Sequence, residues 1–209
     1  MLEDLYESFK ANGATLNKDD KEKYRKLSMD LSMLTLQFDQ NALKDKNRFE
    51  LQITDENELS GLPESARDAA AMLAKSKDKN GWLFNLSAPS YIPFMRYSDK
   101  RDLREKMYRE YMSVGNKGDE FDNKDIIKKI VNIRLEIAQL MGFKNYAEYA
   151  LEHTMAKNSA NVYKLLNQLL EAYKPIAINE YNAVEGFALG TEKELSLIHI
   201  SEPTRRSYI

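Results

Sequence analysis

Two long stretches of the sequence contain almost no residue that would interrupt a helix. Neither glycine nor proline occurs between Leu16 and Ser60, and residues 119–185 contain only Gly142 and Pro175. Glycine and proline destabilise a helix interior most, whereas Leu, Lys, Glu and Ala favour it, so such stretches are typical of long α-helices. The chain is therefore predicted to be mainly α-helical.

Apolar residues recur with helical spacing in three parts of the chain, and a capping signal accompanies each row. Asn17 precedes the first row as an N-cap, Gly142 follows the second where a helix ends, and Asn158 or Ser159 caps the third. Each row would form the buried face of one long helix. The rows are Tyr24, Leu27, Leu31, Leu34 and Phe38; Ile126, Ile130, Ile133, Ile137 and Leu140; and Val162, Leu166, Leu169 and Tyr173.

Pro175 and three shorter helices complete the predicted helical part. The apolar pattern resumes at Ile176 and continues towards Phe187, so we expect Pro175 to kink the third long helix rather than end it. The shorter helices are predicted at about 63–77, with proline first; at 99–112, capped by Ser98; and at 146–153.

A small sheet is predicted between the helices. Residues 49–53 and 82–86 alternate apolar and polar side chains with the period of a half-buried strand. We expect them to form one small antiparallel pair, connected by the helix at 63–77. Pro89 and Pro93 predict an extended loop over residues 87–97.

The chain has few side chains that could carry catalysis. It contains no cysteine and only two histidines, His153 and His199. A zinc-peptidase helix needs two histidines four residues apart, but Lys157 and Pro203 occupy the positions four residues after these two. His153 is therefore interpreted as a histidine at a helix end. No residue is assigned as catalytic, metal-binding or cofactor-binding.

The charges are balanced, with 31 basic and 33 acidic residues and a net charge of −2. Nucleic-acid-binding domains usually carry a clear basic excess, so this class of function is disfavoured. Basic and acidic residues alternate between Arg96 and Lys106, which predicts an exposed, ion-paired helix face. No apolar run is long enough to suggest a membrane-spanning helix.

Two ordered sets of residues resemble a known family. One begins with Leu59-Ser-Gly-Leu-Pro63 and continues through Trp82-Leu-Phe-Asn-Leu86 and Tyr91-Ile-Pro-Phe-Met95 to Arg101-Asp-Leu-Arg104. The other runs from Asn132 to Tyr149 and includes Met141-Gly-Phe-Lys-Asn-Tyr146. In order and spacing the chain resembles the thimet-oligopeptidase-like zinc metallopeptidases, and most closely their bacterial peptidyl-dipeptidase (dipeptidyl carboxypeptidase) branch.

The resemblance implies a large helical hydrolase that cleaves short peptides within a deep channel. Its active site would hold one zinc ion on an H-E-x-x-H helix with a downstream Glu, and none of these residues has a counterpart here. Residues 1–194 are therefore expected to be a single helical portion of such an enzyme, upstream of the catalytic motif. This portion would supply channel wall, bind no zinc, be inactive alone and self-associate through exposed apolar helix faces.

Residues 195–209 read as an artificial tail. Leu195-Ser-Leu-Ile-His-Ile-Ser-Glu-Pro-Thr-Arg205 is similar to an in-frame translation of a sequencing adapter. We expect this tail to be disordered, which would leave His153 as the only native histidine. The parent enzyme is expected to be cytoplasmic, without membrane or nucleic-acid partners. The alternative is a self-contained helical protein-interaction module with no catalytic activity.

Overall fold

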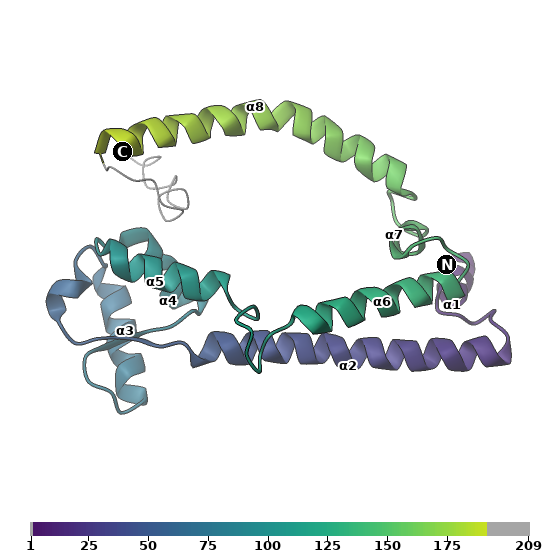
Figure 1. Ribbon diagram of the computed structural model, residues 1–209, viewed down its shortest axis with the longest axis horizontal. Coiled ribbons are helices and arrows are strands. Elements are labelled where there is room, and N and C mark those ends of the chain that lie inside the picture. The colour runs from purple at the N-terminus through teal and green to yellow at the C-terminus, as the bar shows by residue number, and fades with distance from the viewer. Residues whose placement is uncertain (1, 192–209) are drawn as a thin grey trace. The chain divides into compact units, whose positions relative to one another are not determined.

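The computed structural model describes residues 2–191, and the predicted tail at 195–209 lies outside this range. The described part is mainly α-helical, with one two-stranded sheet and a short 3₁₀-helix (Figure 1), which confirms the predicted fold class. The elements are α1 (Leu2–Ala11), α2 (Lys18–Arg48), β1 (Leu51–Ile53), η1 (Glu56–Leu59), α3 (Glu64–Ser76), β2 (Trp82–Phe84), α4 (Ala88–Tyr97), α5 (Arg101–Met112), α6 (Lys124–Leu140), α7 (Tyr146–Leu151) and α8 (Ser159–Thr191).

The chain divides into two compact units. Among the described residues, the first combines 2–40 with 123–174, and the second combines 41–122 with 175–191. The prediction that residues 1–194 form a single portion of a larger peptidase is not tested by this division and stays a prediction.

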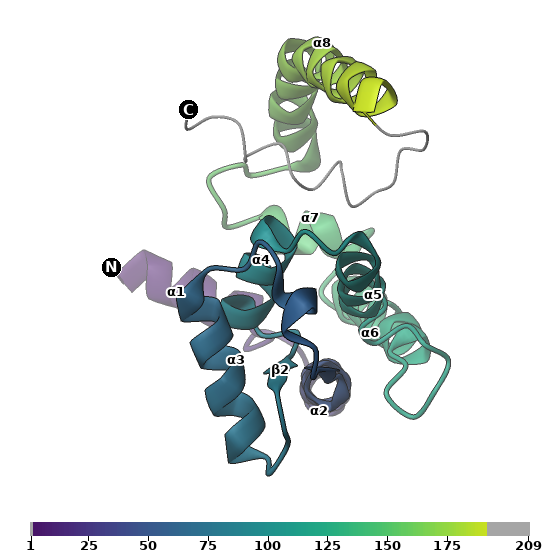
Figure 2. The ribbon, with the colours of Figure 1, turned by 90° about the vertical axis from the view of Figure 1, so that its left-hand side faces the viewer.

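In the first unit, α2 and α6 lie side by side (Figures 1 and 2). Leu27 on α2 is buried, as are Ile126, Ile130 and Ile137 on α6. The first two predicted apolar rows therefore form the contact faces of these helices. Two predicted signals are also confirmed: the Asn17 side chain accepts a 2.9 Å hydrogen bond from the Asp20 amide, and Gly142 follows α6 with φ of +86°.

The third predicted helix is confirmed as an element but not as a buried one. α8 continues through Pro175, so the proline does not end it. Asn158 is its cap, because its side-chain oxygen accepts a 2.9 Å hydrogen bond from the Asn161 amide. No side chain described on α8 is buried. Its apolar row is therefore exposed to solvent in the described part of the chain.

The core of the second unit is built on the small sheet. β1 and β2 pair antiparallel, with Gln52 opposite Leu83, as predicted. Ile53, Leu59, Leu86 and Phe94 are at most 1% exposed and form the centre of this core, against which α3 packs. Figure 2 shows α3, α4 and β2 grouped together. Packing between segments 30 to 40 residues apart therefore organises this unit.

The predicted loop at 87–97 is wrong, because this segment forms helix α4. Pro89 lies in the first turn, where its missing N–H is not needed, and only Pro93 lies in the helix interior. An interior proline costs about 3 kcal/mol, whereas burying Phe94 and Met95 contributes about 2 kcal/mol for each side chain. Burial therefore outweighs the local preference.

Two predicted boundaries also differ. Helix α5 begins at Arg101 rather than Asp99, because the Ser98 hydroxyl accepts a 3.2 Å hydrogen bond from the Lys100 amide and ends an extended segment there. Arg104 is 7% exposed and donates to the Ser98 carbonyl, so the alternating charges near it do not form a fully exposed face as predicted. α7 ends at Leu151, two residues before the predicted end.

Candidate functional site

The described residues do not provide a zinc site. Zinc in proteins is held by three or four Cys, His, Asp or Glu side chains. Among residues 2–191, no group of three such side chains lies close enough to hold a metal. His153 Nε2 lies 3.3 Å from Glu152 Oε2, an adjacent pair without a third ligand. These described residues are therefore assigned no metal-dependent step, and His199 lies outside the described range.

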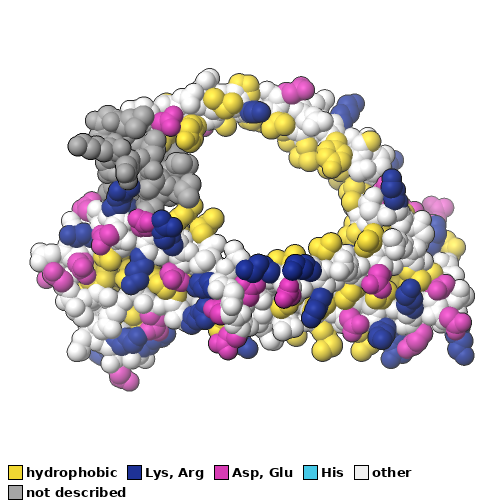
Figure 3. Space-filling view, in the orientation of Figure 1, with side chains coloured by type: hydrophobic (Ala, Val, Ile, Leu, Met, Phe, Trp, Pro, Cys, Tyr) yellow, Lys and Arg dark blue, Asp and Glu magenta, His cyan; other side chains and the backbone are white. Residues whose placement is uncertain are grey.

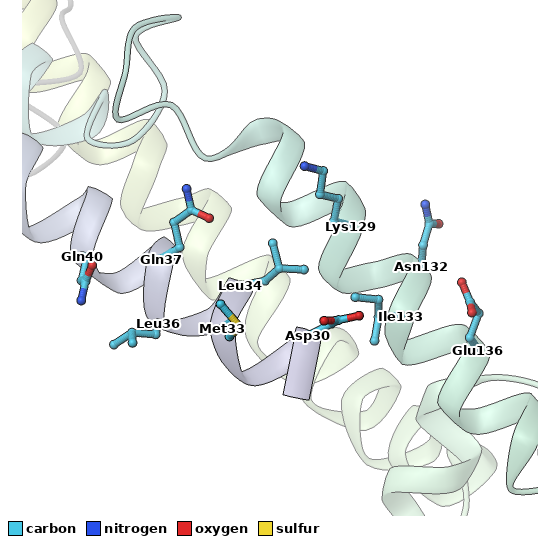
Figure 4. Close-up of a pocket in the computed structure, with 10 residues that line it drawn as sticks. All are labelled: Asp30, Met33, Leu34, Leu36, Gln37, Gln40, Lys129, Asn132, Ile133 and Glu136. Atoms are coloured by element: carbon cyan, nitrogen blue, oxygen red, sulfur yellow. The ribbon is translucent and has the colours of Figure 1, made fainter. Parts of the chain in front are cut away.

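A surface groove runs between α2 and α6 in the first unit, and it is the candidate functional site. Its volume is about 700 Å³. Figure 4 shows Leu34 and Ile133 between the two helices, with Lys129, Asn132 and Glu136 along α6. The lining residues are Asp30, Met33, Leu34, Leu36, Gln37, Gln40, Lys129, Asn132, Ile133 and Glu136.

The groove combines an apolar floor with a polar rim. Leu34 and Ile133 are half-buried, whereas Met33 and Leu36 are 68% and 58% exposed. The rim carries amides, which can donate and accept hydrogen bonds, and charges of both signs. A surface of this composition can contact the backbone and the side chains of an extended peptide.

Local contacts hold the two helices that form the groove. Asn123 immediately precedes α6 and is 3% exposed. Its side-chain nitrogen donates a 3.0 Å hydrogen bond to the Phe38 carbonyl on α2, while its own carbonyl accepts from Ile127 in the first turn of α6. The start of α6 is therefore fixed to α2 at one end of the groove.

The helix α7 and the start of the chain are joined in the same unit. The Tyr149 hydroxyl donates a 2.7 Å hydrogen bond to the Ala11 carbonyl at the end of α1. Arg134 on α6 lies over the ring of Tyr146, at 5.3 Å from its centre. Burial, together with contact to Tyr24, raises the pKa of the Tyr149 hydroxyl, which therefore stays protonated and able to donate.

The second unit contains a buried carboxylate cluster. Asp45, near the end of α2, is fully buried and accepts hydrogen bonds from the Gly115 amide at 2.7 Å and from Lys117 Nζ at 3.2 Å. Arg48 Nε lies 2.7 Å from the same carboxylate and also pairs with Asp119. This cluster attaches the loop after α5 to the end of α2.

Electrostatics in this cluster favour the charged forms. The hydrogen bond from Arg48 lowers the pKa of the Asp119 carboxyl below its ordinary value. Burial lowers the pKa of Lys117, but hydrogen bonds to Glu110 and Asp45 outweigh burial and raise it overall. Asp119 and Lys117 therefore stay ionised at neutral pH, and the cluster has a structural rather than a catalytic character.

The sequence analysis singled out neither the polar rim of the groove nor the carboxylate cluster, although the sequence carries a signal for the apolar part of the groove and one for the cluster. Met29, Met33 and Leu36 form a second apolar row on the same helix as the first. The first row, continued with its own spacing of three and four, reaches Asn41 and Asp45, which are 9% and 0% exposed. A polar residue at the buried position of an apolar row is the signal that was missed.

Comparison with known proteins identifies the family. Residues 94–198, just over half of the chain, match peptidase family M3. Oligopeptidase A of Haemophilus influenzae is 35% identical over 204 residues, which cover 96% of this chain and 30% of the relative. Probable cytosolic oligopeptidase A of Arabidopsis thaliana is 37% identical over 90% of this chain and 28% of its own length.

A dipeptidyl carboxypeptidase is also similar. The enzyme of that name from Escherichia coli is 28% identical over 186 residues, which cover 88% of this chain and 27% of the relative. The chain thus spans less than a third of the length of these curated relatives. The comparisons confirm the resemblance to the thimet-oligopeptidase-like metallopeptidases: the chain belongs to peptidase family M3.

Proposed function

We propose that this chain is a portion of a zinc-dependent M3 peptidase that hydrolyses short peptides. In this proposal it supplies helical wall to the substrate channel, while the zinc ligands and the catalytic motif belong to the rest of the longer protein. The observation that carries the proposal is the family membership, combined with relatives more than three times as long as the matched segment.

The groove between α2 and α6 is proposed to contact the peptide. Amide side chains such as Gln37 and Asn132 would hydrogen-bond to its backbone, and Leu34 and Ile133 would contact apolar side chains. Such contacts bind the ground state and the transition state equally, so they lower KM more than they raise kcat. The groove is therefore a substrate-holding wall in this proposal, and the chain alone hydrolyses nothing.

Two finer parts of the proposal have different support. Release of dipeptides from C-termini rests on the likeness to the dipeptidyl carboxypeptidase, at 28% identity. The name oligopeptidase A belongs to relatives at 35% and 37%. A cytoplasmic location rests on the relative named as cytosolic, and no helix among residues 2–191 is long and apolar enough to cross a membrane.

The first test is the longer protein itself. Longer genomic reads are expected to extend the frame beyond Glu194 into an H-E-x-x-H motif. The purified full-length protein is expected to contain one zinc ion, to cleave short peptides, and to lose activity on chelation. A frame without the motif, or a stable, monomeric 209-residue chain with a sharp thermal transition, would instead favour the alternative of an interaction module.

A matched pair of variants tests the groove in that full-length protein. Met33 and Met72 are both exposed methionines, at 68% and 73%, but only Met33 lines the groove. Met33→Asp is expected to raise KM about tenfold with kcat nearly unchanged, whereas Met72→Asp leaves both unchanged. Equal effects of the two substitutions would remove the groove from the proposal.

A further inference from the structure

Helix α8 carries many large apolar side chains that are exposed. Ten large apolar side chains on it are between 43% and 64% exposed. In the space-filling view, hydrophobic side chains follow much of this helix (Figure 3). The ten residues are Tyr163, Leu165, Leu166, Leu169, Leu170, Tyr173, Ile176, Ile178, Tyr181 and Phe187.

The width of this surface indicates how many neighbours it needs. At 100° per residue, all of these side chains except Ile178 fall within an arc of about 160° of the helix circumference. A helix that packs on one neighbour has an apolar stripe of about 100°, whereas a wider arc is typical of a helix inside a larger protein. α8 therefore needs at least two neighbouring elements to cover it.

The charges of α8 limit the kind of neighbour. Four of the five charged residues of α8, Lys164, Glu171, Lys174 and Glu185, share one side with Asn167, opposite the apolar arc, and the fifth, Glu180, lies within the arc. Helices that bind a membrane surface carry a polar face rich in lysine and arginine, but this face has as many acidic as basic residues. A second copy of α8 would cover only one flank of the arc. The surface therefore fits neither a lipid surface nor a simple helix pair.

We propose that α8 is the docking surface for the part of the M3 peptidase that lies outside this chain. This inference rests on the proposed function. The match to the family extends over the whole of α8, and the aligned relatives have more than two thirds of their length outside the matched segment. That remainder supplies the helices that cover the apolar arc on both flanks.

The test divides the full-length protein into two polypeptides after Glu194 and measures their association. The two chains are expected to form a 1:1 complex on size-exclusion chromatography. Leu166→Lys, on the apolar arc, is expected to weaken association about 30-fold, as loss of a central interface residue does. Asn167→Lys adds the same charge on the polar side, and is expected to change association less than about twofold.

Both substitutions leave the rest of the chain intact, because no α8 side chain is buried in the described part. The fluorescence transition of Trp82, the only tryptophan of this chain, checks this for the second unit. Equal weakening by both variants, or a homodimer of this chain that excludes the second polypeptide, would overturn the docking surface. Zinc content and peptide cleavage of the undivided protein test the proposed function separately, so either idea can fail while the other stands.

Discussion

The carboxylate of Asp45 accepts a 2.7 Å hydrogen bond from the backbone N–H of Gly115, a residue 70 positions further along the chain. Both residues are buried, and Lys117 and Arg48 bind the same carboxylate. One side chain thus joins the end of a long helix to the loop that follows α5. The interaction makes the second unit sensitive to a single polar atom.

Replacing this carboxylate tests that dependence. Asp45→Asn is expected to lower the free energy of unfolding of the second unit by about 2 kcal/mol, because it removes the buried charge that Arg48 and Lys117 share. Arg48 keeps its pair with Asp119, and Lys117 keeps its pair with Glu110. Urea unfolding followed by Trp82 fluorescence reports on this unit. Asp68→Asn, an exposed aspartate on α3, is the matched control and is expected to change stability by less than about 0.5 kcal/mol.

The stability of the same unit is expected to depend on pH through Glu50. Hydrogen bonds from Lys77 and then Lys79 lower the pKa of this carboxyl below its ordinary value of 4.5. A lowered pKa means that the charged form stabilises the fold above pH 4.5, and that this contribution is lost as the pH falls through the folded-state pKa.

Glu50→Gln isolates this contribution. Because all three side chains are partly exposed, the free energy of unfolding of the wild type is expected to exceed that of the variant by about 1 kcal/mol or less at pH 7. The difference in urea midpoint is expected to shrink steadily below pH 4.5. A difference that stays constant down to pH 3 would contradict the role of the two lysines.

Gly61 is expected to tolerate no side chain. Its φ is +82°, and an added Cβ would lie 2.1 Å from the Tyr97 carbonyl oxygen. Gly118 has a similar φ of +72° but no atom within 4 Å of that position. Gly118→Ala is therefore expected to lower the free energy of unfolding by about 1 kcal/mol, from backbone strain alone. Gly61→Ala is expected to lower it by at least about 3 kcal/mol, because the clash is added to the strain. Trp82 fluorescence again measures both, since both glycines lie in the second unit.

Tyr149 is expected to protect the backbone amides that follow α1 from hydrogen exchange. Removing its hydroxyl in Tyr149→Phe takes away the hydrogen bond to the Ala11 carbonyl, which is worth about 1 kcal/mol. Amide hydrogen exchange of residues 12–14 is expected to become about fivefold faster. Tyr146→Phe keeps the ring over which Arg134 lies and serves as the control, with exchange at these amides unchanged.

The helices were predictable where a local signal agreed with packing. The rows beginning at Tyr24 and Ile126 gave both the helices and their buried faces, because the same periodicity decides both. The helix at Ala88–Tyr97 was not predictable from local preference, since two prolines argue against it and only the burial of Phe94 and Met95 outweighs them. Helix α1 received no assignment from the sequence, because its short length gives little periodicity.

The candidate site was less predictable than the fold. Its floor residues Leu34 and Ile133 were recognised, but as core positions. The polar rim is defined only by which α6 residues lie opposite α2, and that register depends on Asn123 contacting the Phe38 carbonyl. A hydrogen bond between residues 85 positions apart cannot be predicted from the local sequence around either residue.

The exposed arc of α8 has a consequence for how the chain behaves in a cell. Chaperones and proteases recognise apolar segments that stay in contact with water, whatever the stability of the neighbouring parts. Under the proposed docking, the cellular lifetime of this chain is expected to depend on how soon α8 is covered. Mutations that strengthen the core around Phe94 would raise its melting temperature without raising its yield.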